Sequence, residues 1–90
     1  MAITMDPRTV QRALQGDVEA TRLLESHLRG VARQLLAHPA LQVDDPVTQR
    51  VLANAAVAEA LERELRDMDT LLAAAIMAAA RRGVEHMRRV

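Results

Sequence analysis

The chain has 90 residues with twelve basic and twelve acidic side chains, and it contains no Cys, Phe, Trp or Tyr. The balanced charge excludes a broad nonspecific attraction to nucleic acid or anionic lipid, and the absence of cysteine excludes disulfides, thiol catalysis and cysteine zinc sites. A chain of this length folds as one small domain. Its apolar half is aliphatic, which favours helices packed on helices over sheets. We therefore expect a single all-α domain over residues 1–90, a compact bundle of about four helices.

Two further properties of the sequence concern location. No apolar run is long enough to span a bilayer, and the first six residues lack the charged and apolar regions of a signal peptide. We expect a cytoplasmic protein with no membrane partner. Residues 1–5 are expected to be flexible.

Start and stop signals divide the chain into four segments. Asp6-Pro7 and Asp45-Pro46 each place a capping carboxylate before a proline at the first helical position. Gly16-Asp17 ends one helix and begins the next, and His38-Pro39 ends the second helix because a residue before proline disfavours the helical conformation. The expected helices cover about 6–15, 18–37, 46–67 and 70–89.

Apolar side chains recur every three or four residues in each long segment, which predicts the face of each helix that enters the core. The second helix offers Leu24, Leu28, Val31 and Leu35, widened by Leu23, Ala32 and Leu36. The third offers Val47, Val51, Ala55, Ala58, Leu61, Leu65 and Met68, with Asn54 at the border. The fourth offers Leu72, Ile76, Ala79 or Ala80, Gly83, Met87 and Val90.

Two details of the packing are less determined by local sequence. Gly30 and Gly83 lie inside expected helices, where glycine costs about 1 kcal/mol relative to alanine, so we expect a neighbour to approach each closely. A turn is expected within residues 67–70, which hold two possible helix caps. Fusion of the third and fourth helices into one rod is the alternative.

Charge is unevenly distributed along the chain. Residues 44–69 hold seven acids against three arginines, whereas residues 70–90 hold four arginines against one acid. In the third helix Glu59 precedes Arg63 by four residues, and Glu62 likewise precedes Arg66, a spacing that contributes about 0.2–0.5 kcal/mol per pair. We expect these pairs to form a solvated face.

The sequence offers no catalytic arrangement, because it holds one serine and no cysteine, lysine or tyrosine. Ser26 and His27 are adjacent, so on a helix they point in different directions and cannot form a nucleophile and base pair. His27 and His38 lie about 16 Å apart along a helix axis, too far to chelate one metal. We expect no enzyme, no cofactor and no metal site.

The basic residues at the end of the last helix are candidate nucleic-acid-binding residues, because arginines bind phosphate. They are Arg81, Arg82, Arg88 and Arg89. The alternative is that these cations only complement the dipole at the helix C-terminus.

Three pieces of the chain, taken together, resemble region 2 of bacterial sigma factors of the extracytoplasmic-function type. The first is Gly16-Asp17-Val18-Glu19-Ala20 followed by Leu23-Leu24-Glu25-Ser26-His27. The second is Val43-Asp44-Asp45-Pro46-Val47-Thr48-Gln49, similar to the acidic start of the helix that docks on the polymerase clamp. The third is Ala79-Ala80-Arg81-Arg82-Gly83-Val84-Glu85-His86-Met87-Arg88-Arg89, similar to the Ala-Arg-x-x-x-x-Asp-His-Leu-Arg-Arg ending of the family.

The chain departs from this family in two ways that bear on function. It lacks the aromatic residues that stack on unpaired promoter bases, an interaction that contributes about 1–3 kcal/mol per base. Arg50 lies on a helix face that the family keeps free of strong positive charge. The resemblance therefore implies a region-2-like module that does not melt promoters.

The resemblance implies specific partners. Asp44, Asp45 and Gln49 would bind RNA polymerase, while the four terminal arginines would lie on the DNA backbone. One alternative is a sigma mimic that binds an anti-sigma protein. Another is a small helical adaptor or self-associating protein, such as a homodimer, with no nucleic-acid role.

Overall fold

The computed structural model describes residues 6–64 and 67–89, and over these residues the protein is all-α. The order of elements is α1 (Pro7–Leu14), α2 (Val18–Leu36), a short 3₁₀ helix η1 (Pro39–Leu41), α3 (Pro46–Glu62) and α4 (Met68–Arg89). The described residues contain four α-helices and no strand, which confirms the predicted bundle. The expectation that residues 1–5 are flexible lies outside the described residues.

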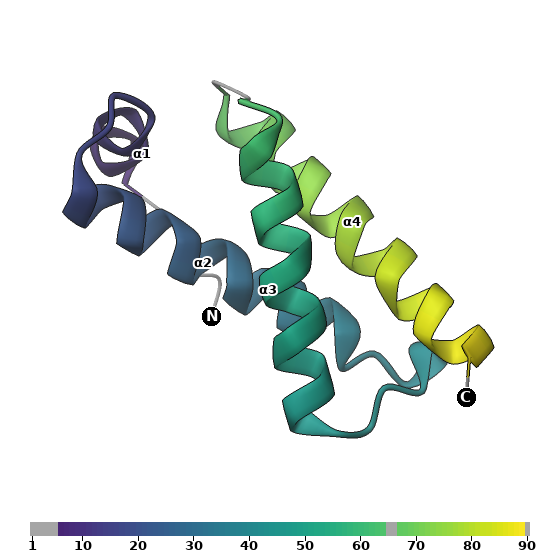
Figure 1. Ribbon diagram of the computed structural model, residues 1–90. Coiled ribbons are helices and arrows are strands. Elements are labelled where there is room, and N and C mark those ends of the chain that lie inside the picture. Colours follow the sequence, from purple (N-terminus) through teal and green to yellow (C-terminus); the bar gives the residue numbers. More distant parts are fainter. Residues whose placement is uncertain (1–5, 65–66, 90) are drawn as a thin grey trace.

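The other three α-helices are arranged around α2, which contacts each of them (Figure 1). α1 packs against the first turns of α2, where the Thr21 hydroxyl donates to the Ala13 carbonyl at 3.4 Å. α3 and α4 lie side by side as an antiparallel hairpin, so the start of α3 and the end of α4 lie at the same end of the molecule (Figure 1). The described helices all lack the combination of length and apolarity needed to cross a bilayer.

The helix starts follow the local signals in the sequence. The carboxylate of Asp6 accepts from the backbone N–H of Arg8 at 3.1 Å, and that of Asp17 accepts from Ala20 at 2.9 Å. Gly16 has φ of +95°, a conformation that only glycine adopts without strain. These contacts confirm the predicted caps and the predicted stop between the first two helices.

The turn between α3 and α4 confirms two separate helices, so the fused-rod alternative is wrong. α3 ends at Glu62, five residues earlier than expected, and Glu64 follows in the left-handed conformation with φ of +54°. Such a residue ends a helix because it breaks the hydrogen-bond ladder. Asp67 then caps α4 by accepting from the Thr70 N–H at 3.1 Å.

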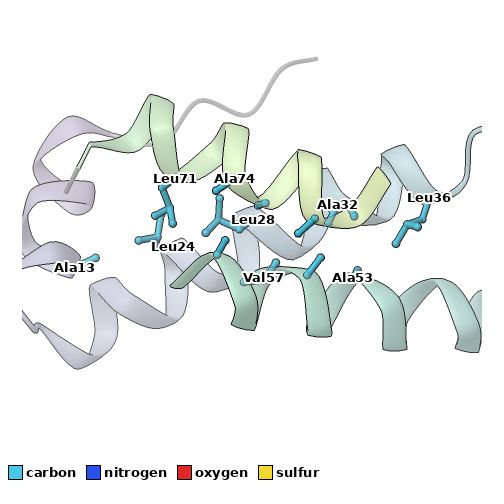
Figure 2. Close-up of a cluster of buried hydrophobic side chains, with 14 of the residues drawn as sticks. Ala13, Leu24, Leu28, Ala32, Leu36, Ala53, Val57, Leu71 and Ala74 are labelled. Carbon is cyan, nitrogen blue, oxygen red and sulfur yellow. The ribbon is translucent and has the colours of Figure 1, made fainter. Parts of the chain in front are cut away.

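The core is thin and aliphatic, and Figure 2 shows side chains of α2, α3 and α4 converging in it. Its largest fully buried side chains are Leu24, Leu28, Leu36 and Leu71. Around them lie alanines that let the helix backbones approach closely: Ala20, Ala32, Ala53, Ala56, Ala60, Ala75, Ala78 and Ala79. A few leucines are therefore the large side chains that fill this core.

The face that α3 turns toward the core was predicted only in part, since Leu61 and Met68 of the predicted stripe do pack against the core. Its buried residues are Ala53, Ala56, Val57 and Ala60, whereas Val47 and Val51 of the predicted stripe are 56% and 58% exposed. Ala58 is exposed as well, as is Asn54, which therefore needs no buried partner. α3 carries apolar residues on more than one side, and α2 and α4 pack on the side where short alanines permit close approach.

The core faces of α2 and α4 were predicted in part. Leu24 and Leu28 are buried as expected, but Leu23 is 53% exposed. In α4 Leu71 is fully buried and the predicted Leu72 is partly buried against the core, while Ala79 and Gly83 are buried as predicted. Leu65 and Val90 of the predicted stripes lie outside the described residues.

The two helical glycines differ. A Cβ added at Gly83 would lie 3.0 Å from Cδ1 of Leu41 and 3.1 Å from Cδ2 of Leu36, which confirms the predicted close approach. Gly30 is exposed, and among the described residues a Cβ there would meet nothing within 4 Å. The predicted close approach at Gly30 is therefore wrong for this part of the chain, since none of the described helices covers that side of α2.

Candidate functional site

An apolar stripe lies on the side of α3 that faces away from the core. We call it the outer face of α3 and define it by Val47, Val51, Asn54 and Ala58, all four of which are exposed. Their spacing of four, three and four residues is that of a seam between two packed helices. A helix that is apolar on both sides is ordinarily buried on both sides, so the outer face has the character of a contact surface.

The three predicted partner-binding residues lie at the start of α3 and have different roles there. Asp44 is exposed, and within the described residues it has no hydrogen-bond or ion-pair partner. Asp45 caps α3 by accepting from the backbone N–H and the hydroxyl of Thr48, at 3.1 and 2.7 Å. The pKa of Asp45 is lowered chiefly by that hydroxyl bond.

Gln49 is half-buried, and its side-chain amide donates to the carbonyl of Val43 at 2.6 Å. Val43 is buried at 4% exposure, so this bond fixes the connector that leads into α3. Asp45 and Gln49 therefore shape the start of the helix. Of the three predicted residues, Asp44 alone presents its carboxylate to solvent without a role in the cap.

A positive charge accompanies the outer face of α3. Arg50 is exposed, one turn after Val47 and one turn before Asn54. The surface near the start of α3 thus combines two valines, one unpaired acid and one arginine. This is the composition of a mixed helix-docking surface, apolar at its centre and charged at its edge.

The four predicted nucleic-acid-binding arginines fall into two pairs. Arg81 and Arg82 both donate to the same oxygen of Glu59 on α3, Arg82 at 3.0 Å. The pKa of Glu59 is lowered, first by the hydrogen bond from Arg81 and then by that from Arg82. Arg88 and Arg89 lie in the last turn of α4 and are exposed.

The Glu59 contact corrects the predicted ion pair between Glu59 and Arg63 on α3. The ion-pair partners of Glu59 are Arg81 and Arg82, and not Arg63. The second predicted pair, between Glu62 and Arg66, lies outside the described residues through Arg66. Glu59 was missed as a site residue because its partners are 22 and 23 residues away in the sequence.

The acidic and basic regions of the sequence are joined in space. Glu59 belongs to the acidic region and binds the first arginines of the basic one. The start of α3, with Asp44, and the end of α4, with Arg88 and Arg89, lie at the same end of the bundle (Figure 1). A large partner at this end could contact both charges at once.

Other chemistry is sparse in the part of the chain that the structure describes. There, no group of three or more His, Asp or Glu residues could hold a metal ion. His38 has a structural role, because its Nδ1 accepts from the N–H of Ala40 at 3.1 Å and caps η1. The exposed surfaces of α3 and α4 are therefore the candidate functional sites.

Comparison with protein-family models, curated proteins and solved structures found no match for this chain. The resemblance to sigma region 2 and the partners that it implies stay predictions.

Proposed function

We propose that this chain is a transcription-associated, sigma region 2-like module that docks on RNA polymerase through the outer face of α3 and does not melt promoters. The observation that carries the docking role is the exposure of Val47 and Val51 on a helix whose opposite side is already buried. The resemblance supplies the identity of the partner.

The energetics favour a helical partner at this face. Burying a valine fully is worth about 1.5–3 kcal/mol, so covering the exposed half of each valine would contribute roughly 1 kcal/mol. Asp44 at the edge favours a partner with positive charge, since complementary potentials steer encounter and fix orientation. Arg88 and Arg89, at the same end of the bundle, supply cations that can lie on DNA phosphates next to such a partner.

The experiment is a binding titration with purified core RNA polymerase. Val51→Glu places a charge at the centre of the outer face and is expected to weaken binding at least about tenfold, which corresponds to about 1.4 kcal/mol. Met77→Glu is the matched control, because Met77 is 69% exposed on α4 and lies away from the proposed face. Equal losses for the two variants, or no binding of the wild-type chain at low salt, would contradict the proposal.

The charged residues at the edge of the outer face give a second test, in which two charge reversals are expected to change the affinity in opposite directions. Asp44→Arg is expected to weaken polymerase binding, and Arg50→Glu is expected to strengthen it, if the partner is positively charged there. Asp44 is preferable to Asp45 for this purpose, because removal of the Asp45 cap would destabilise α3 by about 0.5–2 kcal/mol. The reverse order of the two affinities would contradict a basic partner.

An anti-sigma protein is the alternative occupant of the same face, as expected for a sigma mimic. The two alternatives are distinguished by which of the two proteins binds the chain. Binding to an anti-sigma protein that Val51→Glu abolishes, together with no binding to core polymerase, would replace the polymerase proposal with the mimic.

Self-association is a second candidate function, and the position of Asn54 within the outer face of α3 favours it. Asn54 lies between Val51 and Ala58 on that face, and an Asn within a seam between two helices fixes register. Sedimentation that shows a dimer in the wild type and a monomer in Val51→Glu would support this function and leave no face for polymerase.

A further inference from the structure

The contact between Glu59 and two arginines of α4 places both arginines on one oxygen of the carboxylate. The terminal nitrogens of Arg81 and Arg82 both donate to Oε1 of Glu59, so two guanidinium groups converge on a single oxygen. The side chains remain partly open to solvent, at 54% exposure for Arg81 and 31% for Arg82. The converging donors are therefore reachable from outside.

The donors at this point outnumber the acceptors. Each guanidinium carries five N–H donors and one positive charge, whereas Glu59 supplies one negative charge. The Nε atom of Arg82 is buried and has no hydrogen-bond partner among the described residues. Among the described residues, the nearest additional carboxylate is that of Glu85, at 4.0 Å from Nε of Arg81, beyond hydrogen-bonding distance.

We propose that Arg81 and Arg82 form a binding site for a phosphate group, and that Glu59 occupies this site as an internal anion in the unbound protein. A phosphate oxygen placed where Oε1 lies would keep both arginine bonds. The other oxygens of the phosphate would accept from arginine N–H donors that the carboxylate leaves unused. Planar guanidinium groups also match phosphate geometry well. The ligand chemistry is thus phosphate, from a nucleic-acid backbone or from free phosphate.

This inference does not depend on the proposed docking function. The phosphate site lies where α3 and α4 meet, and the docking surface is the outer face of α3. Polymerase binding can fail while phosphate binding succeeds, and the reverse also holds.

The first arm of the experiment uses a short DNA duplex at low salt, with affinity measured by fluorescence anisotropy. Glu59→Gln keeps the shape of the side chain and removes its charge, and is expected to tighten binding about tenfold relative to the wild type, or about 1.4 kcal/mol. Glu62→Gln removes one charge from an exposed position of the same helix. It is the matched control for the loss of one negative charge, and its gain is expected to be smaller than that of Glu59→Gln. Glu62 is one helical turn from Glu59, but among the described residues it has no hydrogen bond or ion pair with Arg81 or Arg82.

The salt dependence makes this arm more specific. Two freed arginines that each contact a phosphate make the negative slope of log affinity against log salt steeper by about 1.8, since each contact contributes about −0.9. In the background of Glu59→Gln, the double change Arg81→Ala and Arg82→Ala is expected to remove both the tighter binding and the steeper slope. An equal gain in Glu62→Gln, or a gain that survives loss of both arginines, overturns the backbone-phosphate form of the proposal.

The second arm uses inorganic phosphate and follows the Nε–H signals of the arginines by NMR. In the wild-type chain and in Glu59→Gln, phosphate is expected to shift the signals of Arg81 and Arg82 more than those of Arg88 and Arg89, at lower concentration in the variant. Shifts with inorganic phosphate but no gain on DNA assign the site to free phosphate. No preferential shift in this arm, together with no DNA gain specific to Glu59→Gln, overturns the proposal entirely.

Discussion

The two sides of α3 differ in a way that hydrophobicity alone does not anticipate. Three of the four buried residues on the inner side are alanines, while the outer side exposes two larger valines. In a bundle without aromatic residues, close approach of helix backbones decides which side is buried, and short side chains allow that approach. Val47 and Val51 are left facing outward, where they can serve a partner.

The largest expected change in stability comes from making the same substitution, alanine to leucine, on each side of α3. Ala53→Leu inserts volume where Ala53 is fully buried, and is expected to destabilise the fold by about 1–3 kcal/mol through overpacking. Ala58→Leu adds the same side chain on the outer face and is expected to change stability by less than about 0.5 kcal/mol. Urea unfolding followed by circular dichroism measures both, and similar losses would contradict the assignment of the two sides.

The two helical glycines extend the comparison to α2 and α4. Gly30→Ala is expected to stabilise the fold by about 0.5–1 kcal/mol, because alanine is the better helix former and its Cβ meets no atom of the described residues within 4 Å. Gly83→Ala brings the same helix propensity but places its Cβ against Leu41 and Leu36, so its gain is expected to be smaller or reversed. Thermal unfolding compares them, and equal gains would show that α4 is not closely packed at this position.

The smallest expected change in the free energy of unfolding concerns Glu59. This residue lies between Ala58 on the outer side of α3 and Ala60 on the inner side. Its pKa lies below the ordinary value of 4.5, chiefly because Arg81 donates to it. A lowered folded pKa contributes stability that is present above about pH 4.5 and is lost as the pH falls through the folded value.

The deficit of Glu59→Gln relative to the wild type is therefore expected near neutral pH and is expected to shrink by about pH 3. Asp17 and Asp45 also have lowered pKa values, but they are present in both proteins and cancel in the difference. Unfolding free energies at the two pH values test this, and a deficit that does not change with pH would rule out the ion pair.

Local chemistry made the starts of the first three helices predictable, and long-range packing limited the rest. Asp6, Asp17 and Asp45 could be assigned as caps because a cap depends on amides only two or three residues away. The core side of α3 could not be assigned, since two apolar sides compete and the choice depends on helices elsewhere in the chain. A surplus of apolar residues around that helix was the available signal that one side would remain exposed.

For the candidate sites, the sequence predicted which residues cluster but not which of them are paired. The clustering of arginines in α4 was evident from the sequence, but their division into a pair held by Glu59 and a terminal pair depends on the hairpin of α3 and α4. Likewise, Asp44 and Asp45 are adjacent and chemically identical. Only the geometry of the helix start distinguishes the capping residue from the exposed one.

The central claim is that α3 serves the bundle with one side and a partner with the other. Transferred cross-saturation from core RNA polymerase to the valine methyl groups of this chain tests it directly, because only methyls at the contact lose intensity. We predict losses at Val47 and Val51, and none at buried Val57 or at Val18, which is 69% exposed on α2. Losses at Val18 equal to those at Val51, or no loss at any valine, would contradict the claim.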